Sequence, residues 1–254
     1  FRALRNRFGH WNVYVSAQIA DEDYTRGMSV EELMGNLTVQ MIDELHLAVS
    51  LRSFRSEQVS AFIKAVLDVD FIAAKNLYQS IKPTYPIVLT RNLDDARAWV
   101  RGKARGTERY GLTASSGAKR LRTFGIWVQS NIDAENWFLN STDDVRSSFF
   151  LEDTATEFDI QGLELDWSIV AWDADLRVEN GAFASYSFKG SRWNNINSQE
   201  AQHYLKNAYR VLLTRARQGF VIFVPLGNDA DVTRRSVFYD QTYSYLLEIG
   251  IEEI

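Results

Sequence analysis

Short apolar runs alternate with longer amphipathic segments along most of the chain. Residues 87–89, 167–172 and 220–224 are almost entirely apolar, which is typical of strands buried on both faces of a parallel sheet. The full set of predicted strands spans residues 12–17, 87–89, 111–114, 167–172, 182–189 and 220–224. Because helical segments separate these strands, the pattern predicts an α/β fold with a mainly parallel sheet covered by helices on both faces.

The segments between the strands repeat their apolar positions at helical spacing. In residues 56–80, for example, Phe62, Ile63 and Val66 fall on one stripe, and Ser56 is the expected N-cap. A second helix is expected to begin at Asn92 or Asp94. The predicted helices span residues 29–35, 56–80, 94–100, 200–214 and 239–249, while 115–122 is predicted as a short helix or loop and 131–150 as mostly loop.

The composition narrows the classes of protein to which the chain can belong. None of its 254 residues is cysteine, which excludes a disulfide framework, a cysteine zinc site, an iron–sulfur cluster and a thiol nucleophile. No stretch approaches 18 apolar residues, so no membrane span is predicted. We expect a cytoplasmic location, since a chain without cysteine suits a reducing compartment. Because the first residue is Phe1, we also expect the chain to be part of a longer protein.

Positive charge is concentrated in one segment of an otherwise acidic chain. The net charge is −5, yet residues 91–122 contain nine basic and three acidic residues, a local charge of +6. This segment is either a face that binds the phosphates of a nucleic acid or a solvated helical surface. Three of its cations lie close together, at Arg101, Lys103 and Arg105.

Three further segments carry polar residues next to predicted strands or helices. Residues 156–166 place several polar side chains and a glycine before a strand, where a ligand can approach the backbone closely. Residues 209–217 carry three arginines at the end of an amphipathic helix, and residues 51–56 carry two more before a long helix. Taken singly, each segment also has a plainer interpretation. Residues 156–166 could be an ordinary loop, the arginines of 209–217 could be cations that favour a helix C-terminus, and residues 51–56 could be a solvated N-cap.

Taken in order, the segments resemble the later motifs of superfamily 1 DNA/RNA helicases. Residues 53–56 resemble the motif that places an arginine on the γ-phosphate of the nucleotide. Residues 156–164 resemble motif V, and residues 209–216 resemble motif VI, which contains the arginine finger. The residues of these motifs are similar to those of a bacterial family of helicase-like ATPases whose helicase core is related to that of Schlafen proteins. Gln18 lies where motif III keeps a glutamine, although the usual Gly-Asp pair is missing.

The resemblance implies a division of the chain and a role for several residues. Residues 1–81 would be the tail of a first RecA-like lobe with connecting helices, and residues 82–254 a second RecA-like lobe. The implied catalytic residues are Arg215 and Arg55, and the implied nucleotide-binding residues are Gln18, Gln161, Gly162 and Glu164. The implied nucleic-acid-binding residues are Thr90, Arg91, Arg101, Lys103, Arg105, Ser115, Ser116 and Thr156.

One essential part of a helicase ATPase is missing from the sequence. There is no Gly-x-x-x-x-Gly-Lys-Ser/Thr loop to hold phosphates. ATP and Mg²⁺ are therefore expected in a longer parent protein with an upstream ATPase lobe, and neither is expected to bind this chain tightly. Single-stranded DNA or RNA is the expected partner, and no metal site is predicted. The alternative is a non-catalytic module for nucleic-acid binding or assembly.

Overall fold

The computed structural model describes residues 2–16, 29, 32, 34–35, 37–42, 45 and 54–254, with side chains from residue 57 onward in the last range. The chain divides into two compact units, Phe1–Phe54 and Arg55–Ile254. In the N-terminal unit, helix α1 (Arg2–Phe8) precedes two paired parallel strands, β1 (Asn12–Val15) and β2 (Thr38–Met41). The N–H groups of Ser29 and Glu32 each donate to the other's side chain, at 3.0 and 3.1 Å, which is the capping box expected where the predicted helix 29–35 begins.

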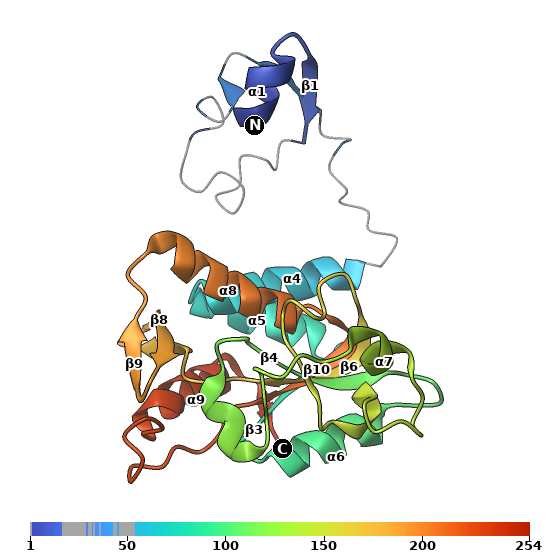
Figure 1. The fold of residues 1–254 in the computed structure, drawn as a ribbon, viewed down its shortest axis with the longest axis vertical. Helices are drawn as coiled ribbons and strands as arrows, with labels where there is room; N and C mark the ends of the chain where they lie inside the picture. The colour runs from blue at the N-terminus through green and yellow to red at the C-terminus, as the bar shows by residue number, and fades with distance from the viewer. Residues whose placement is uncertain are drawn as a thin grey trace. The chain divides into compact units, whose positions relative to one another are not determined.

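The C-terminal unit is built on a six-stranded sheet in which every pair of neighbours is parallel (Figure 1). The strand order is β11-β3-β10-β6-β4-β5. The strands are β3 (Ile87–Thr90), β4 (Tyr110–Ala114), β5 (Thr154–Ala155), β6 (Leu165–Ala171), β10 (Ala216–Phe223) and β11 (Glu252–Glu253). The all-parallel arrangement confirms the α/β fold class.

Alternation along the strands divides the apolar residues between two cores. On β10, Phe220 and Ile222 face one core, while Val221 and Phe223 face the other. The first core is covered by α4 (Phe54–Leu67), α5 (Phe71–Ile81), α8 (Gln199–Leu213) and α9 (Val237–Ile249). The second is covered by α6 (Leu93–Lys103) and the 3₁₀-helix η3 (Lys119–Phe124). Helices therefore cover both faces of the sheet, as the apolar runs indicated.

The predicted helix over residues 56–80 is interrupted, and two helices form in its place. Val69 has a positive φ of 60°, which an α-helix does not accommodate. Asp70 then caps α5, because its carboxylate accepts a hydrogen bond of 3.0 Å from the Ala73 N–H. Both helices contribute to the core of the sheet, since Phe62 on α4 and Tyr78 on α5 are each 1% exposed.

A second, antiparallel sheet is inserted between β6 and α8. It consists of β7 (Leu176–Glu179), β8 (Ala182–Lys189) and β9 (Arg192–Asn195). The predicted strand 182–189 forms, but it belongs to this sheet rather than to the parallel one. The loop-rich segment 131–150 contains the short helix α7 (Ala134–Leu139) and the turn η4 (Ser148–Phe150). Within the described residues, no helix is long and apolar enough to cross a membrane.

Candidate functional site: two edges of the parallel sheet

All strands of a parallel sheet begin at one edge and end at the opposite edge. The edge where strands begin is called the amino edge here, and the edge where they end the carboxyl edge. Glu164 and Arg215 directly precede β6 and β10 and so lie at the amino edge. Ser115 and Thr156 directly follow β4 and β5 and so lie at the carboxyl edge. The two groups of predicted site residues are thus at opposite edges.

Pairing of β6 with β10 brings Glu164 and Arg215 together. The N–H of Leu165 donates to the carbonyl of Arg215 at 3.0 Å, and Leu165 is opposite Ala216 in the register. Glu164 and Arg215 are both half-buried. Gly162 lies in the exposed turn that leads to β6, and its φ of 89° explains why a glycine is needed there. Gln161 is exposed in the same turn.

Helix α8 positions Arg215. Ser198 caps the start of the helix by accepting a hydrogen bond from the Ala201 N–H, and the apolar face of the helix packs on the sheet. The helix ends at Leu213, so Arg215 follows it within two residues and enters β10. Its Nε donates to the carbonyl of Val211 at 3.3 Å, which ties the base of the side chain to the last turn of α8.

Helix α4, which contains Arg55, lies beside α8 and runs in the opposite direction (Figure 1). The end of α4 is joined to α8 by an ion pair of 2.5 Å between Asp68 and Lys206. Because the helices are antiparallel, the first turn of α4 is directed toward the end of α8 that leads to Arg215. The side chain of Arg55 and the whole of Gln18 lie outside the described residues.

Two of the residues predicted at the carboxyl edge are engaged in contacts within the fold. The hydroxyl of Thr90 donates to the carbonyl of Ile254 at 3.0 Å, and the side chain is buried. Arg91 forms an ion pair of 2.8 Å with Asp240, and its guanidinium lies 3.8 Å from the centre of the Tyr243 ring. The Thr90 contact joins the end of β3 to the last residue of the chain, and the Arg91 contacts join it to α9.

Ser116 and Thr156 lie on neighbouring loops of the carboxyl edge and contact carboxylates. The N–H and hydroxyl of Ser116 both donate to Glu157, at 2.8 and 2.7 Å. The N–H and hydroxyl of Thr156 both donate to Asp159, at 2.8 and 2.7 Å. Paired backbone and hydroxyl donors of this kind also suit the oxygens of a phosphate.

A pair of buried carboxylates, which the motifs did not predict, lies behind this edge. Asp173 and Asp175 follow β6 and are 1% and 0% exposed. Asp175 accepts hydrogen bonds from the hydroxyls of Ser115 at 2.7 Å and Tyr209 at 2.5 Å, and Asp173 accepts one from Tyr239 at 3.1 Å. Burial raises the pKa of both carboxyls, and the nearby charge of Asp173 helps to raise the pKa of Asp175 to about 7. The sequence feature that could have indicated this pair is two aspartates that come shortly after an apolar strand.

The basic segment 91–122 does not form one surface. Arg101, Lys103 and Arg105 are exposed at and just beyond the end of α6, which lies toward the amino edge, away from Ser115 and Ser116. Arg109 is directed inward instead. Its guanidinium donates to backbone and hydroxyl oxygens of the loop 137–148, including the carbonyl of Asn140 at 2.8 Å.

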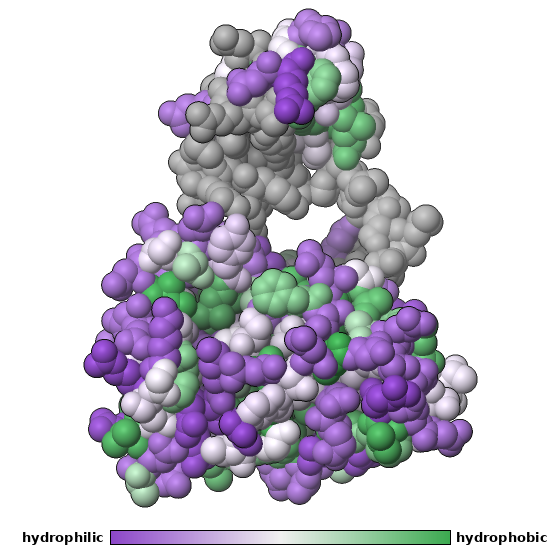
Figure 2. Space-filling model, in the orientation of Figure 1, coloured by the Kyte–Doolittle hydropathy of each residue, from purple (hydrophilic) through white to green (hydrophobic). Residues whose placement is uncertain are grey.

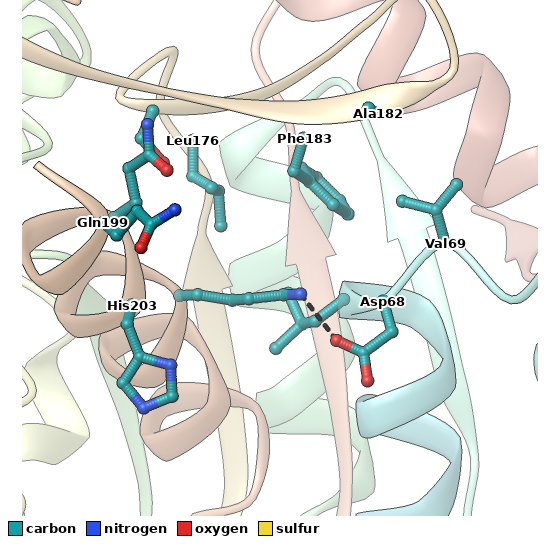
Figure 3. A pocket seen from close by; sticks show the side chains of 11 residues that line it. Asp68, Val69, Leu176, Ala182, Phe183, Gln199 and His203 are labelled. Atoms are coloured by element: carbon teal, nitrogen blue, oxygen red, sulfur yellow. Dashed lines mark hydrogen bonds and ion pairs between the residues drawn. The ribbon is translucent and has the colours of Figure 1, made fainter. Parts of the chain in front are cut away.

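A cavity of about 360 Å³ lies between α4, β8 and α8 (Figure 3). It is lined by the end of α4, by β8 and by the first half of α8, and the Asp68–Lys206 ion pair crosses it. Leu176 and Phe183 form its apolar side, while Gln199 and His203 contribute polar groups from α8. None of the residues predicted for nucleotide or nucleic acid lines this cavity.

No metal centre is found in the part of the chain that the structure describes. Within those residues, no group of three or more His, Cys, Asp or Glu side chains is arranged to hold a metal ion. The chemical groups brought together at the amino edge are instead a guanidinium, a carboxylate and an amide, and those at the carboxyl edge are hydroxyl and backbone N–H donors.

Comparison with known proteins identifies the family. A sequence profile described as "Schlafen group 3, DNA/RNA helicase domain" matches residues 8–225, a range that includes β3 to β10 and the predicted site residues of both edges. No curated protein and no solved structure gives a significant match. The profile match confirms the resemblance to a Schlafen-related helicase core. The chain belongs to the Schlafen group 3 family of DNA/RNA helicase domains.

Proposed function

We propose that the chain is the C-terminal part of an ATP-dependent helicase, or of an ATPase stimulated by nucleic acid, with motifs of the superfamily 1 type. One observation carries this proposal. The pairing of β6 with β10 places Glu164 beside Arg215 at the amino edge, while Ser116 and Thr156 gather at the opposite edge. A lobe with phosphate-binding chemistry at two separate edges can bind a nucleotide and a strand at the same time.

The amino edge supplies charge for phosphoryl transfer. Arg215 acts as the arginine finger, because a guanidinium neutralises negative charge that develops on the transferred group, an effect typically worth about 10³–10⁵ in rate. Arg55 is the second arginine of this site. Gln161, Gly162 and Glu164 line the same side, where the carboxylate accepts hydrogen bonds from a ribose and the glycine permits close approach.

The residues present fit only part of a nucleotide site. Guanidinium and amide donors suit phosphate oxygens, but the sequence has no glycine-rich phosphate-binding loop. When bound, ATP and Mg²⁺ would supply the phosphoryl group and its charge-neutralising cation. An upstream lobe, which would carry the phosphate loop, therefore completes the site, and this chain contributes Arg215 and Arg55 to it.

The carboxyl edge binds the backbone of a single strand. Ser115 and Ser116 after β4 and Thr156 after β5 belong to adjacent strands, since Leu112 is opposite Thr154 in the register. Contacts to a phosphate backbone give little sequence preference, which suits movement along a strand. Thr90 and Arg91 support this edge at β3. Arg101, Lys103 and Arg105 would make a separate contact beyond α6.

The test compares Arg215→Ala with wild type in the natural protein that contains this segment. The expected result is a loss of at least about 10³-fold in nucleic-acid-stimulated phosphate release, with affinity for a single-stranded oligonucleotide kept within about twofold. Arg217→Ala is the matched control, since Arg217 pairs with Asp166 at 2.7 Å and is predicted in neither site. Equal phosphate release by wild type and Arg215→Ala would overturn the arginine-finger role.

The absence of a phosphate loop favours a second candidate, a non-catalytic nucleic-acid-binding or assembly module. In that case the carboxyl edge would bind a strand without any contribution from Arg215 to catalysis. The two candidates differ in one measurement. A natural protein that binds strands but shows no phosphate release above background, with or without nucleic acid, supports the module and excludes the ATPase.

A further inference from the structure

A cavity of about 440 Å³ opens between η3 and the turn that joins β8 to β9, and it is called the hairpin pocket here. Four of its seven lining residues are cationic and none is acidic. The cations are Lys119, Arg120, Arg122 and Lys189. A hollow lined by positive charge favours an anionic ligand, because field lines from the surrounding cations converge inside it.

Most of this charge is not compensated within the fold. Arg120 pairs with Asp231 at 2.9 Å, but its Nε is buried without a hydrogen-bond partner. Among the described residues, Lys119, Arg122 and Lys189 have no carboxylate within ion-pair distance, and the ammonium of Lys119 contacts only the carbonyl of Phe188, at 3.5 Å. The pocket therefore keeps a surplus of positive charge for a ligand.

The tip of the hairpin adds a fifth cation in an unfavourable position. Lys189 is directly opposite Arg192 in the β8–β9 register, and like charges in this arrangement destabilise a hairpin. The next pair, Phe188 and Trp193, packs edge to face with ring centres 5.1 Å apart. The indole N–H of Trp193 donates to the carbonyl of Thr233 at 2.8 Å, so the tip is held in place despite the repulsion. An anion between the two cations would remove that repulsion.

The pocket adjoins the carboxyl edge of the parallel sheet. Helix η3 begins three residues after Ser116, and the N–H of Arg120 donates to Asp173, at the end of β6, at 2.8 Å. Arg122 lies over Trp127, with its guanidinium carbon 3.5 Å from the ring centre. On the face drawn in Figure 2, the apolar residues of the C-terminal unit are scattered among hydrophilic ones, so this face offers no broad apolar surface for docking a protein.

We propose that the hairpin pocket binds consecutive phosphates of a single-stranded nucleic acid that passes along the carboxyl edge. The cations come from two elements and surround an open hollow, so several phosphates in a row can each lie near a positive charge. A site for one ion would instead have backbone N–H groups that converge on a single point. This inference rests on the proposed function, because it extends the path of the strand from Ser116 to the β8–β9 turn.

The test is a salt titration of oligonucleotide binding, measured by fluorescence anisotropy with the 254-residue chain. The triple variant Arg122→Gln, Lys189→Gln, Arg192→Gln is compared with wild type. Each neutralised phosphate of a single strand contributes a log–log slope of about −0.7, so the variant slope should be flatter by about two units. The control triple variant Lys64→Gln, Lys75→Gln, Lys82→Gln removes the same charge from α4, α5 and the residue after α5, and its slope should match wild type.

The possible outcomes separate this inference from the proposed function. If wild type binds no oligonucleotide, both fail. If wild type binds and the two triple variants have equal slopes, the carboxyl edge binds strands but the hairpin pocket does not. If those slopes are equal and inorganic phosphate at millimolar concentration raises the melting temperature of wild type but not of the Arg122, Lys189, Arg192 triple variant, the pocket holds a free anion and not a strand. Thermal unfolding confirms that both variants are folded, since exposed cations contribute little to stability.

Discussion

Two buried carboxylates, Asp173 and Asp175, make the stability of this fold depend on pH. Both are buried, and Asp175 is held by the hydroxyls of Ser115 and Tyr209. Ionising both of these buried carboxyls is costly, so the pKa of each is raised. Gly117 belongs to the same arrangement, because a Cβ at that position would be 2.8 Å from the Asp175 carboxylate.

We predict that the free energy of unfolding falls as pH rises from about 4 to about 7, owing to Asp175. In the unfolded chain this carboxyl loses its proton near pH 4, whereas in the folded chain its pKa is about 7. Between these values the folded state binds more protons, so a rise in pH favours unfolding, and the loss ends above about pH 7.

Asp175→Asn should remove that part of the pH dependence, since the amide is neutral at every pH and resembles the protonated carboxyl. Urea unfolding at about pH 5 and about pH 8 measures the difference for each protein. The variant should show a smaller decline than wild type. An equal decline in both proteins would show that Asp175 is already ionised at the lower pH.

Glu157 is predicted to weaken strand binding at the carboxyl edge. It accepts hydrogen bonds from the N–H and the hydroxyl of Ser116, and a phosphate of the strand would otherwise accept them. Glu157→Gln removes the negative charge, so the affinity for a single-stranded oligonucleotide should rise by about twofold to tenfold, because one nearby charge contributes on the order of 1 kcal/mol. Glu248→Gln on α9 removes the same charge from an exposed position outside both sites and should leave the affinity unchanged.

At the level of elements, Asp70 caps the start of α5 at the break between α4 and α5. Asp70→Ala should lower the free energy of unfolding by about 1 kcal/mol, because the N–H of Ala73 loses its acceptor. Asp70→Asn keeps a side-chain oxygen and should recover most of that loss. Urea unfolding of the three proteins measures the effect. Equal losses for Asp70→Ala and Asp70→Asn would indicate that the charge of Asp70, and not its capping hydrogen bond, stabilises the fold.

The strands of the main sheet could be predicted because burial on both faces leaves a continuous apolar run, as in residues 220–224. The cap at Asp70 was missed because the apolar stripe of residues 56–80 continues across the break. The β7–β9 sheet was missed for a different reason. The strand at 182–189 was predicted, but its partners β7 and β9 have only four residues each, and the antiparallel pairing of β8 with both is seen only in the folded chain.

The residues of the amino edge could be named from the sequence only through their motifs. Glu164 and Arg215 belong to different motifs that are far apart in sequence, and only the pairing of β6 with β10 brings them together. The hairpin pocket was not foreseeable, because Lys119 and Lys189 come from segments that only the folded chain brings together. The buried carboxylates likewise depend on Tyr209 and Ser115, which are distant in sequence.

For the whole molecule, we predict that residues 55–254 fold alone and residues 82–254 do not. Among the described residues, every buried member of the two apolar cores lies at Val59 or later, within the C-terminal unit. Removing α4 and α5 also would expose several buried side chains, including Phe62 and Tyr78, each worth about 2 kcal/mol or more, against a typical total stability of about 5–15 kcal/mol.

Circular dichroism and thermal unfolding show whether each of the two truncated chains, residues 55–254 and residues 82–254, folds alone. Cooperative unfolding of residues 82–254 at the midpoint of the longer fragment would contradict the prediction. It would also support a lobe boundary between residues 81 and 82, the position that the family resemblance implies. Failure of residues 55–254 to fold would instead show that the N-terminal unit is needed for the larger one to form.

The position of β10 in the strand order has a consequence for synthesis on the ribosome. Strands β3 and β6 both pair with β10 and not with each other, yet β10 begins only at Ala216. Until that strand emerges, the nascent chain holds two apolar strands whose inner edges are unpaired, and contacts so distant in sequence form slowly. The growing polypeptide is therefore most prone to aggregation just before its central strand is made, which is when a chaperone would protect it most.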